Sequence, residues 1–412
     1  MNTDNVLSFV IVGHVDHGKS TLIGRLLYDT GTLNPDKIEE MKKMSSQQGR
    51  DTEFAYLLDH LEEERKQGIT IDTTQVFFKT DKRRYVIIDA PGHVEFVKNM
   101  ITGASQAEAA ILIIDANEGV KEQTKRHSYM LSMLGLKQVI VVVNKMDLVD
   151  HSEDKFNSIC KDAGEFLGSI DVSPTMYIPM AALKGDNIAN RSANMGWYKG
   201  LTFLESLDTL ENSKPASDKP LMLPVQDVYK IDDKRINAGR IEAGELASGE
   251  KVKILPGGFK TKIKSIEKFL ENPQQATAGE CIGFITEDSL FLDRGDIVCR
   301  ENKEPTITDT FTARVFWMSR KPLQAGERLL LRCATQEQKC SIEQISRRIN
   351  SSTLELIEEN AKSLENLEVA EVTIKTKKPI CIKDFNEVQE MGRFVMVRDE
   401  NIVAGGIIRT SK

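Results

Sequence analysis

The sequence predicts an α/β domain with a mostly parallel sheet covered by helices on both faces, followed by two antiparallel β-barrel domains. In the first half of the 412-residue chain, short apolar runs alternate with helix-forming stretches, as in βαβ units. In the second half, short strands are separated by Gly and Asp turns instead. We therefore expect an α/β domain over 1–211, a linker over 212–219, and barrels over 220–303 and 306–412.

The strands expected in the first domain are five short segments rich in aliphatic and aromatic residues. In chain order they read VLSFVIVG, TTQVFFKT, RRYVIIDA, EAAILIIDA and QVIVVVNK. The apolar runs at 84–88, 109–114 and 139–143 do not alternate with polar residues, which predicts strands that helices bury on both faces. Helix-forming stretches begin at Lys19 and Val120, between strands that they would connect.

A polar stretch, ENSKPASDKP at 211–220, interrupts this rhythm and is expected to link the domains. Beyond it, INAGRIEAGELASGEKVKILPGG has the short strands and glycine turns of a small antiparallel barrel. A second break, ENKEPTITD, precedes the other barrel. The stretch from Ser352 to Leu367 has the local pattern of an amphipathic helix, but the strand-like segments on either side favour a barrel there.

Composition excludes several classes of protein. The chain carries 55 Lys and Arg against 62 Asp and Glu, a net charge of −7, so its surface as a whole does not attract nucleic acid. No apolar run approaches the roughly 18 residues of a membrane helix, and the N-terminus lacks the features of a secretory signal. The six cysteines form no CxxC pair or Cys/His cluster, which argues against a structural zinc and fits a reducing compartment. We therefore expect a cytoplasmic protein.

The first expected strand runs directly into GHVDHGKS, from Gly13 to Ser20, and then into a helix-forming stretch. This is the GxxxxGK[ST] pattern in the strand-loop-helix context that it requires. Backbone N–H groups of the loop would cradle the α- and β-phosphates, Lys19 would reach the β- and γ-phosphates, and the Ser20 hydroxyl would bind Mg²⁺. The predicted phosphate-binding residues are Gly13, His14, Val15, Asp16, His17, Gly18, Lys19, Ser20 and Thr21.

Two further segments are expected to complete the contacts to magnesium and the γ-phosphate. Asp89 ends an apolar strand, where α/β sheets bind ligands, and its carboxylate can hold a water molecule on Mg²⁺. Gly92 would offer its N–H to the γ-phosphate, and Thr70 would join the Mg²⁺ ligands only when the γ-phosphate is present. The alternatives are a plain DxPG turn after Asp89 and a strand-entry threonine at Thr70.

The segment NKMD, from Asn144 to Asp147, follows the apolar run VIVVV. The Asp147 carboxylate can accept hydrogen bonds from the N1–H and the exocyclic amine of guanine, whereas adenine has an acceptor at N1 and would leave a buried charge unpaired. Asn144 and the methylene stem of Lys145 would complete the base pocket. In this order, the motifs predict a P-loop GTPase domain that uses GTP or GDP with Mg²⁺ rather than ATP.

At the level of whole segments, GHVDHGKST, QGITID, DAPGH, NKMD and NMITGAS resemble the translation-factor class of GTPases, in which a G domain precedes two β-barrels. Longer pieces, such as ALKGDNIANRSANMGWYKGLTFLESL and VFWMSRKPLQAGERLLLR, are most similar to the GTPase subunit of bacterial ATP sulfurylase, sulfate adenylyltransferase subunit 1. GHVDHGKS and HVEFVKNMITGAS are closer to elongation factor 1-alpha and elongation factor Tu, because the sulfurylase subunit usually has an acidic residue where His17 stands.

The resemblance implies catalytic roles for four residues. His93 would orient the attacking water or stabilise the transition state beside the γ-phosphate, together with Lys19. Val15 and Ile69 would form the hydrophobic gate that keeps the imidazole ring turned away until a partner docks. In the same class Asp16 faces the phosphates and would hold a monovalent cation, with a loop-capping role as the equal alternative.

The resemblance also extends to the base pocket, where a segment that usually reads SAL is here Ala181, Ala182 and Leu183. The backbone N–H of Ala182 would bond guanine O6. Because the serine is missing at 181, we expect slightly weaker contacts to the base.

The favoured interpretation from sequence is therefore a GTPase subunit of sulfate adenylyltransferase, whose hydrolysis of GTP drives the synthesis of adenylyl sulfate on a separate catalytic partner subunit. Since the chain has no second nucleotide motif, ATP and sulfate would bind the partner, and no nucleic acid would be needed. The alternative is an elongation factor that delivers aminoacyl-tRNA to the ribosome. A regulatory GTPase with another adenylylating partner is a third possibility.

Overall fold

The computed structural model describes residues 6–33, 36, 39, 74–89, 107–212, 216–231, 234–268 and 271–409. It divides into two compact units, one made mainly of the first 213 residues and the other mainly of the residues from Lys214 onward. Each unit is described by itself. Within the described residues, the model contains no helix both long and apolar enough to cross a membrane.

The first unit is built on a six-stranded sheet with the order β2-β3-β1-β4-β5-β6. Its strands are β1 (Val6–Gly13), β2 (Thr74–Lys79), β3 (Arg84–Asp89), β4 (Ala109–Asp115), β5 (Gln138–Asn144) and β6 (Pro174–Pro179). All neighbours pair in parallel except β2, which is antiparallel to β3. The central strands β4 and β5 are buried almost throughout, as their unbroken apolar sequences predict.

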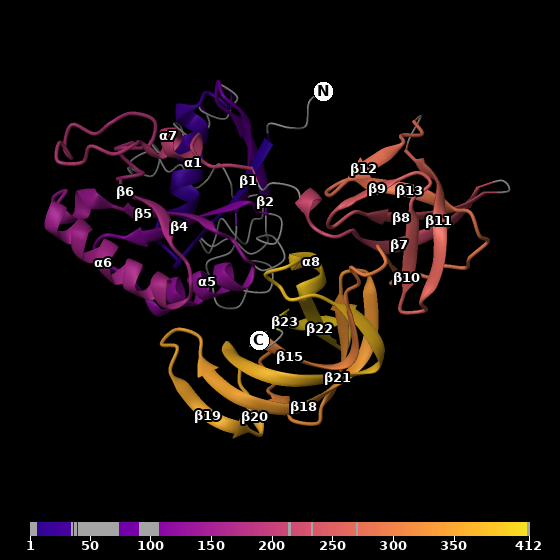
Figure 1. Cartoon of the computed structure of the whole chain (residues 1–412). Helices are drawn as coiled ribbons and strands as arrows, with labels where there is room; N and C mark the ends of the chain where they lie inside the picture. The colour runs from indigo at the N-terminus through magenta and orange to yellow at the C-terminus, as the bar shows by residue number, and fades with distance from the viewer. Residues whose placement is uncertain are drawn as a thin grey trace. The chain divides into compact units, whose positions relative to one another are not determined.

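Helices cover both faces of this sheet (Figure 1). They are α1 (Lys19–Asp29), α5 (Glu122–Met133), α6 (Glu153–Ser169) and the short α7 (Phe203–Leu207). Side chains of α1 and α7 pack with those of the sheet in one hydrophobic core. Both α6 and α7 begin at residues whose hydroxyls cap the helix: Ser152 accepts from the Lys155 N–H, and Thr202 forms a capping box with Glu205.

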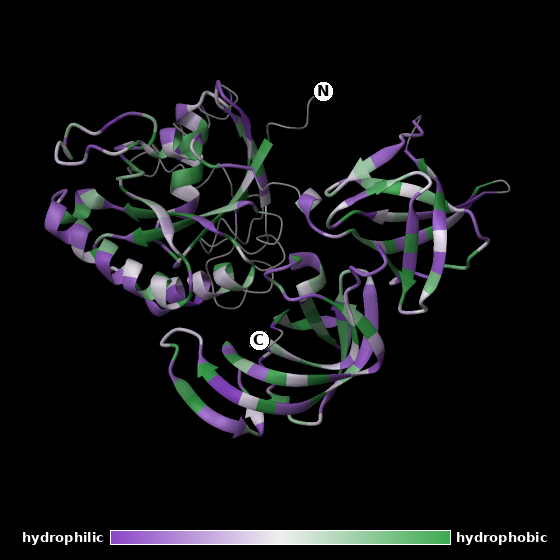
Figure 2. Ribbon diagram, in the orientation of Figure 1, coloured by the Kyte–Doolittle hydropathy of each residue, from purple (hydrophilic) through white to green (hydrophobic). Residues whose placement is uncertain are grey.

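The second unit contains first a closed six-stranded antiparallel barrel, in the order β10-β11-β13-β8-β7-β14. Its strands are β7 (Met222–Ile231), β8 (Lys234–Arg240), β10 (Lys251–Leu255), β11 (Phe259–Glu267), β13 (Cys281–Thr286) and β14 (Ile297–Cys299). Two short strands, β9 (Glu245–Ala247) and β12 (Gln275–Thr277), pair with each other. Hydrophobic and hydrophilic residues alternate along β11, so that one face of the strand points into the core (Figure 2).

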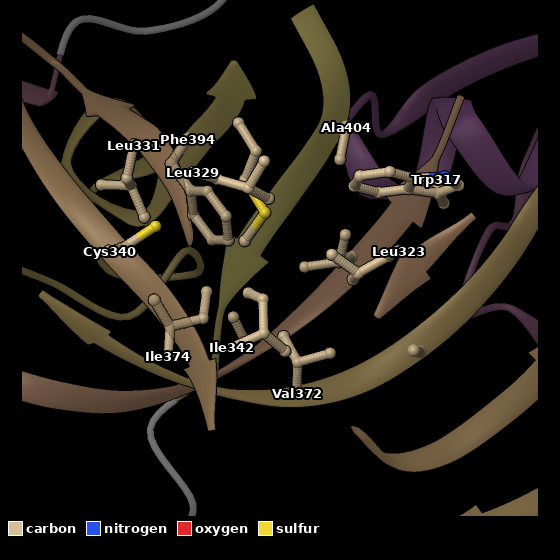
Figure 3. Close-up of a cluster of buried hydrophobic side chains, with 14 of the residues drawn as sticks. Trp317, Leu323, Leu329, Leu331, Cys340, Ile342, Val372, Ile374, Phe394 and Ala404 are labelled. Atoms are coloured by element: carbon tan, nitrogen blue, oxygen red, sulfur yellow. The ribbon is translucent and has the colours of Figure 1, made fainter. Parts of the chain in front are cut away.

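A seven-stranded antiparallel sheet follows, in the order β17-β22-β23-β15-β21-β18-β19. Its strands are β15 (Thr306–Trp317), β17 (Arg328–Cys333), β18 (Gln336–Asn350), β19 (Leu356–Ala361), β21 (Glu368–Ile382), β22 (Arg393–Arg398) and β23 (Asn401–Ile408). An additional pairing of β17 with β18 closes the barrel. Its core holds Trp317, Ile342, Val372 and Phe394 among other side chains (Figure 3).

The smaller elements complete the second unit: β16 (Leu323–Gln324), β20 (Ser363–Leu364), the 3₁₀ turn η4 (Ala216–Asp218) and α8 (Gln389–Gly392). The stretch from Ser352 to Leu367, which has the local pattern of a helix, contains strands β19 and β20, so the preference for a barrel there is confirmed. The predicted fold class is confirmed as well. The domain and linker boundaries stay predictions. All six cysteines are free thiols, four of them buried.

Candidate nucleotide-binding site

Four strands of the first sheet end in residues that meet at its carboxyl edge. Their last residues are Gly13 on β1, Asp89 on β3, Asp115 on β4 and Asn144 on β5. The register places Asp115 directly opposite Asn144, and Asp89 beside β1 two residues before Gly13. Since β1 lies between β3 and β4, this is the edge at which open α/β sheets bind ligands.

Two residues of the loop between β1 and α1, Asp16 and Gly18, have positive φ angles. Gly18 has a φ of +94°, and a Cβ built on it would lie 2.4 Å from the Nδ2 of Asn144. Asp16 also lies in the left-handed region, at φ 64°. The loop is therefore packed against β5 too closely for a side chain at position 18. The loop continues directly into the first turn of α1, whose backbone N–H groups are available to an anion.

Lys19, the first residue of α1, contacts this loop through its side chain. Its ammonium donates hydrogen bonds to the carbonyl oxygens of Gly13, at 3.1 Å, and His14, at 2.9 Å, and the residue is only 7% exposed. Burial lowers the pKa of Lys19 to about 8, although the negative charges of Asp89 and Asp16 act in the opposite direction. A buried cation solvated by carbonyl groups fits a site for an anion such as phosphate.

Asn144 joins the phosphate loop to the segment at 181–183. Its Nδ2 donates to the carbonyl oxygen of His17, and its Oδ1 accepts from the backbone N–H of Ala182, both at 2.9 Å. The N–H of Ala182 is thus already engaged in the structure, and its predicted bond to guanine O6 stays a prediction. Leu183 is exposed, and its carbonyl oxygen accepts a hydrogen bond from Arg25 on α1 at 3.4 Å.

Lys145 begins the turn that carries Asp147. It has a φ of 60°, and the half-buried Asp147 follows in the 3₁₀ turn η3 (Met146–Val149). The ammonium of Lys145 lies 2.8 Å from the Oδ2 of Asp115. Burial alone would raise the pKa of Asp115, but hydrogen bonds from Lys145 and from the backbone N–H of Asn117 hold it below its ordinary value. Sequence reasoning missed Asp115, although it ends an apolar strand just as Asp89 does.

The loop also contacts α5, through a histidine side chain whose partner sequence reasoning did not predict. The ring of His14 lies 5.1 Å from the fully buried ring of His17, and its Nδ1 contacts the Oε1 of Gln123. One turn further along α5, burial lowers the pKa of His127 to about 3, aided by the charge of Lys19. Burial also lowers the pKa of His17. At neutral pH, the imidazole of His127 is therefore uncharged.

The structure brings together most of the residues predicted for nucleotide binding. The loop from Gly13 to Thr21, Asp89, Asn144 to Asp147 and the segment at 181–183 all lie near the carboxyl edge of the sheet. Thr70, Ile69, Gly92 and His93 fall outside the described residues. The roles assigned to all of them stay predictions.

Two known protein families match this chain. The family described as "Elongation factor Tu GTP binding domain" matches residues 4–216, which is more than half of the chain. The chain belongs to the translation-factor GTPase family. The match accounts for a phosphate loop and an NKxD segment on the same sheet edge, and it shows that this translation-factor GTPase binds GTP and GDP. A second family, "GTP-eEF1A C-terminal domain-like", matches residues 310–409.

Relatives of this translation-factor GTPase match over nearly its whole length. Elongation factor 1-alpha of Methanopyrus kandleri is 39% identical, and the alignment covers 98% of each chain. Elongation factor 1-alpha of Thermoplasma acidophilum is 40% identical, again with 98% of each chain covered. That of Methanocaldococcus jannaschii is 38% identical, with 98% of this chain and 96% of the relative covered.

These relatives correct the interpretation that the sequence favoured. Assignment as a GTPase subunit of sulfate adenylyltransferase, with a catalytic ATP sulfurylase subunit as partner, is wrong, because the full-length relatives are named elongation factor 1-alpha. The two segments that suggested the sulfurylase subunit lie over 182–207, which includes α7, and over 315–332 in the second barrel. The alignment with elongation factor 1-alpha covers 98% of the chain, so similarity in these two segments did not separate the two branches. The histidine at position 17, where the sulfurylase subunit usually has an acidic residue, correctly indicated the elongation factors.

Proposed function

We propose that this protein is a translation elongation factor that binds aminoacyl-tRNA in its GTP form and delivers it to the ribosome. The observation that carries the proposal is the similarity to proteins named elongation factor 1-alpha, at 39–40% identity over 98% of both chains. Because the similarity extends through both barrels, it concerns the whole molecule and not the nucleotide-binding domain alone.

The geometry supports a division of the nucleotide site into a phosphate half and a base half. The loop from Gly13 to Ser20 would hold the phosphates through its N–H groups, with Lys19 supplying the positive charge. Asn144 fixes the distance between this loop and the segment at 181–183. Asp147 would select guanine by accepting from N1–H and the amino group, flanked by the stem of Lys145.

A magnesium ion fits the same half of the site. Ser20 lies in the first turn of α1, and Asp89, whose carboxylate is buried, is the last residue of β3. A hydroxyl oxygen and a carboxylate oxygen, the ligand types that Mg²⁺ prefers, are therefore both at the carboxyl edge of the sheet. Ser20 and Thr70 would bind the ion, and Asp89 would hold one of its water molecules. When bound, Mg²⁺ neutralises charge on the β- and γ-phosphate oxygens. Asp16, exposed at the loop tip, is the residue for a monovalent cation.

Apart from Val15 and Lys19 in the phosphate loop, the residues expected to act in hydrolysis and switching lie outside the described part of the chain. His93 would position the attacking water, and Val15 with Ile69 would restrict the movement of its ring. Thr70 and Gly92 would contact the γ-phosphate, so loss of that group would release both segments and change the affinity for aminoacyl-tRNA.

Delivery to programmed ribosomes tests the proposal. Ribosomes with a message in place should take up labelled, codon-matched aminoacyl-tRNA faster with this protein and GTP than with the protein and GDP. Lys19→Ala should abolish the stimulation because it removes the phosphate partner, whereas Lys161→Ala, on the outer face of α6, should retain it. Uptake that is the same with GTP, with GDP and without the protein would refute the proposal.

A further inference from the structure

Asp115, at the end of β4, contacts two parts of the nucleotide site and the loop that leads to α5. Its carboxylate lies 2.8 Å from the ammonium of Lys145, and its backbone nitrogen lies 3.3 Å from the Nδ1 of His17 in the phosphate loop. Its Oδ1 accepts from the backbone N–H groups of Asn117, at 2.7 Å, and Glu118, at 3.3 Å. The residue is only 3% exposed, so these contacts hold the carboxylate in one place.

The contact with Lys145 is important because Lys145 lies next to the turn that carries Asp147. Lys145 is the left-handed residue between β5 and the turn that carries Asp147. Its side chain is one-third exposed, and a lysine in such a position samples many rotamers unless its end is anchored. A buried carboxylate on the neighbouring strand anchors the ammonium, so both ends of the four-methylene stem are held.

We propose that Asp115 is a positioning residue for the guanine base. It holds the ammonium of Lys145 so that the methylene stem forms a wall of the base pocket before nucleotide binds. The flat base then packs against this wall without first having to order the side chain. The inference deepens the guanine site of the proposed function and rests on it.

A purely structural role for Asp115 predicts different behaviour. In that case its function would be to accept the N–H groups of Asn117 and Glu118, and so to shape the loop that leads to α5. Asp115→Asn separates the two roles, because the amide keeps one oxygen for those N–H groups but loses the charge that holds Lys145. Lys145→Met removes the same ion pair from the other side while keeping an unbranched stem.

The experiment is calorimetric titration of the full chain, in buffer containing magnesium, with GDP and separately with inorganic pyrophosphate. Asp115→Asn should weaken GDP binding about tenfold, the scale of a lost hydrogen bond between charged groups, and should leave the affinity for pyrophosphate within about twofold of wild type. In the Lys145→Met background, Asp115→Asn should weaken GDP binding no further. Glu165→Gln, which removes the exposed pair with Lys161 on α6, is the matched control and should change nothing.

Three outcomes would overturn the inference. These are GDP affinity unchanged in Asp115→Asn, an equal loss of GDP and pyrophosphate affinity, or a full additional loss in the Lys145→Met background, since each means that the carboxylate does not act through the lysine stem. If Asp115→Asn fails to fold, Lys145→Met alone must show the loss confined to GDP. Failure of the wild-type chain to prefer GDP over ADP would instead refute the guanine site itself.

Discussion

Lys19 places a positive charge inside the phosphate loop, where burial lowers its pKa to about 8. The carbonyl oxygens of Gly13 and His14 solvate the ammonium, but a phosphate group would supply full negative charge next to it. Binding of nucleotide should therefore return the pKa of Lys19 toward its ordinary value. The free loop and the occupied loop then hold different numbers of protons at mildly alkaline pH.

Proton uptake on GDP binding tests this prediction. Between about pH 7.5 and 9, free Lys19 becomes largely neutral while phosphate-bound Lys19 stays protonated, so uptake should rise from a small fraction toward one proton per nucleotide. Calorimetry in buffers of different ionisation enthalpy measures this number. Lys161→Ala should show the same rise. Uptake that does not change over this interval would contradict the assignment of Lys19 to the phosphates.

Comparison of Asp89 with Asp115 shows how far the residues of the nucleotide site can be predicted from sequence. Both end apolar parallel strands, but only Asp89 was predicted to act in the site, because a recognisable DxPG segment follows it. The role of Asp115 depends on its pairing with β5, and the contact of His14 with Gln123 joins residues 109 positions apart. Local patterns carry no information on such contacts, whereas the phosphate loop is a single continuous segment and was predictable.

Helix α5 carries one histidine, His127, whose ring is buried. Burial lowers the pKa of His127 to about 3, whereas the same side chain in the unfolded chain titrates near 6.5. Between these values the unfolded state binds the additional proton. The stability that the neutral ring contributes is therefore complete above about pH 6.5 and is lost as the pH falls.

Replacement of His127 should flatten the pH dependence of stability. Between about pH 6.5 and 5, the free energy of unfolding of the wild type should fall by about 2 kcal/mol more than that of His127→Leu. Urea denaturation at several pH values measures the difference. Met130→Leu, a buried change on the same helix that removes no titrating group, should keep the wild-type slope. Equal slopes for His127→Leu and wild type would mean that the ring is protonated in the folded state.

The elements that the sequence predicted correctly depend on their own local sequence, whereas β6, α6 and α7 were not predicted. Helix α1 begins at the expected Lys19, and α5 begins at Glu122, two residues after the expected Val120. The stretch from Ser352 to Leu367 shows the limit of local patterns: its spacing is that of a helix, but pairing of β19 with β18 makes it a strand. Tertiary pairing, which no local pattern reports, decides such segments.

At the scale of the whole molecule, the fold is compatible with two functions, that of a sulfate adenylyltransferase subunit and that of an elongation factor. A GTPase domain with two barrels serves both branches that the sequence resembles, so the fold does not determine what the molecule carries or activates. Similarity along 98% of the chain to proteins named elongation factor 1-alpha favours the carrier. A carrier must use the nucleotide to change its affinity for a ligand, and that requirement can be measured.

The rate of hydrolysis of the aminoacyl-tRNA ester measures this nucleotide-dependent affinity most directly. With the protein in its GTP form, at a concentration about tenfold above the Kd, the ester should be hydrolysed about tenfold more slowly than in free solution, because most of it is bound. The GDP form, and Lys19→Ala with GTP, should give the rate of the free ester. If the ester is hydrolysed at the same rate with the GTP form, the GDP form and no protein, the chain is not a carrier of aminoacyl-tRNA.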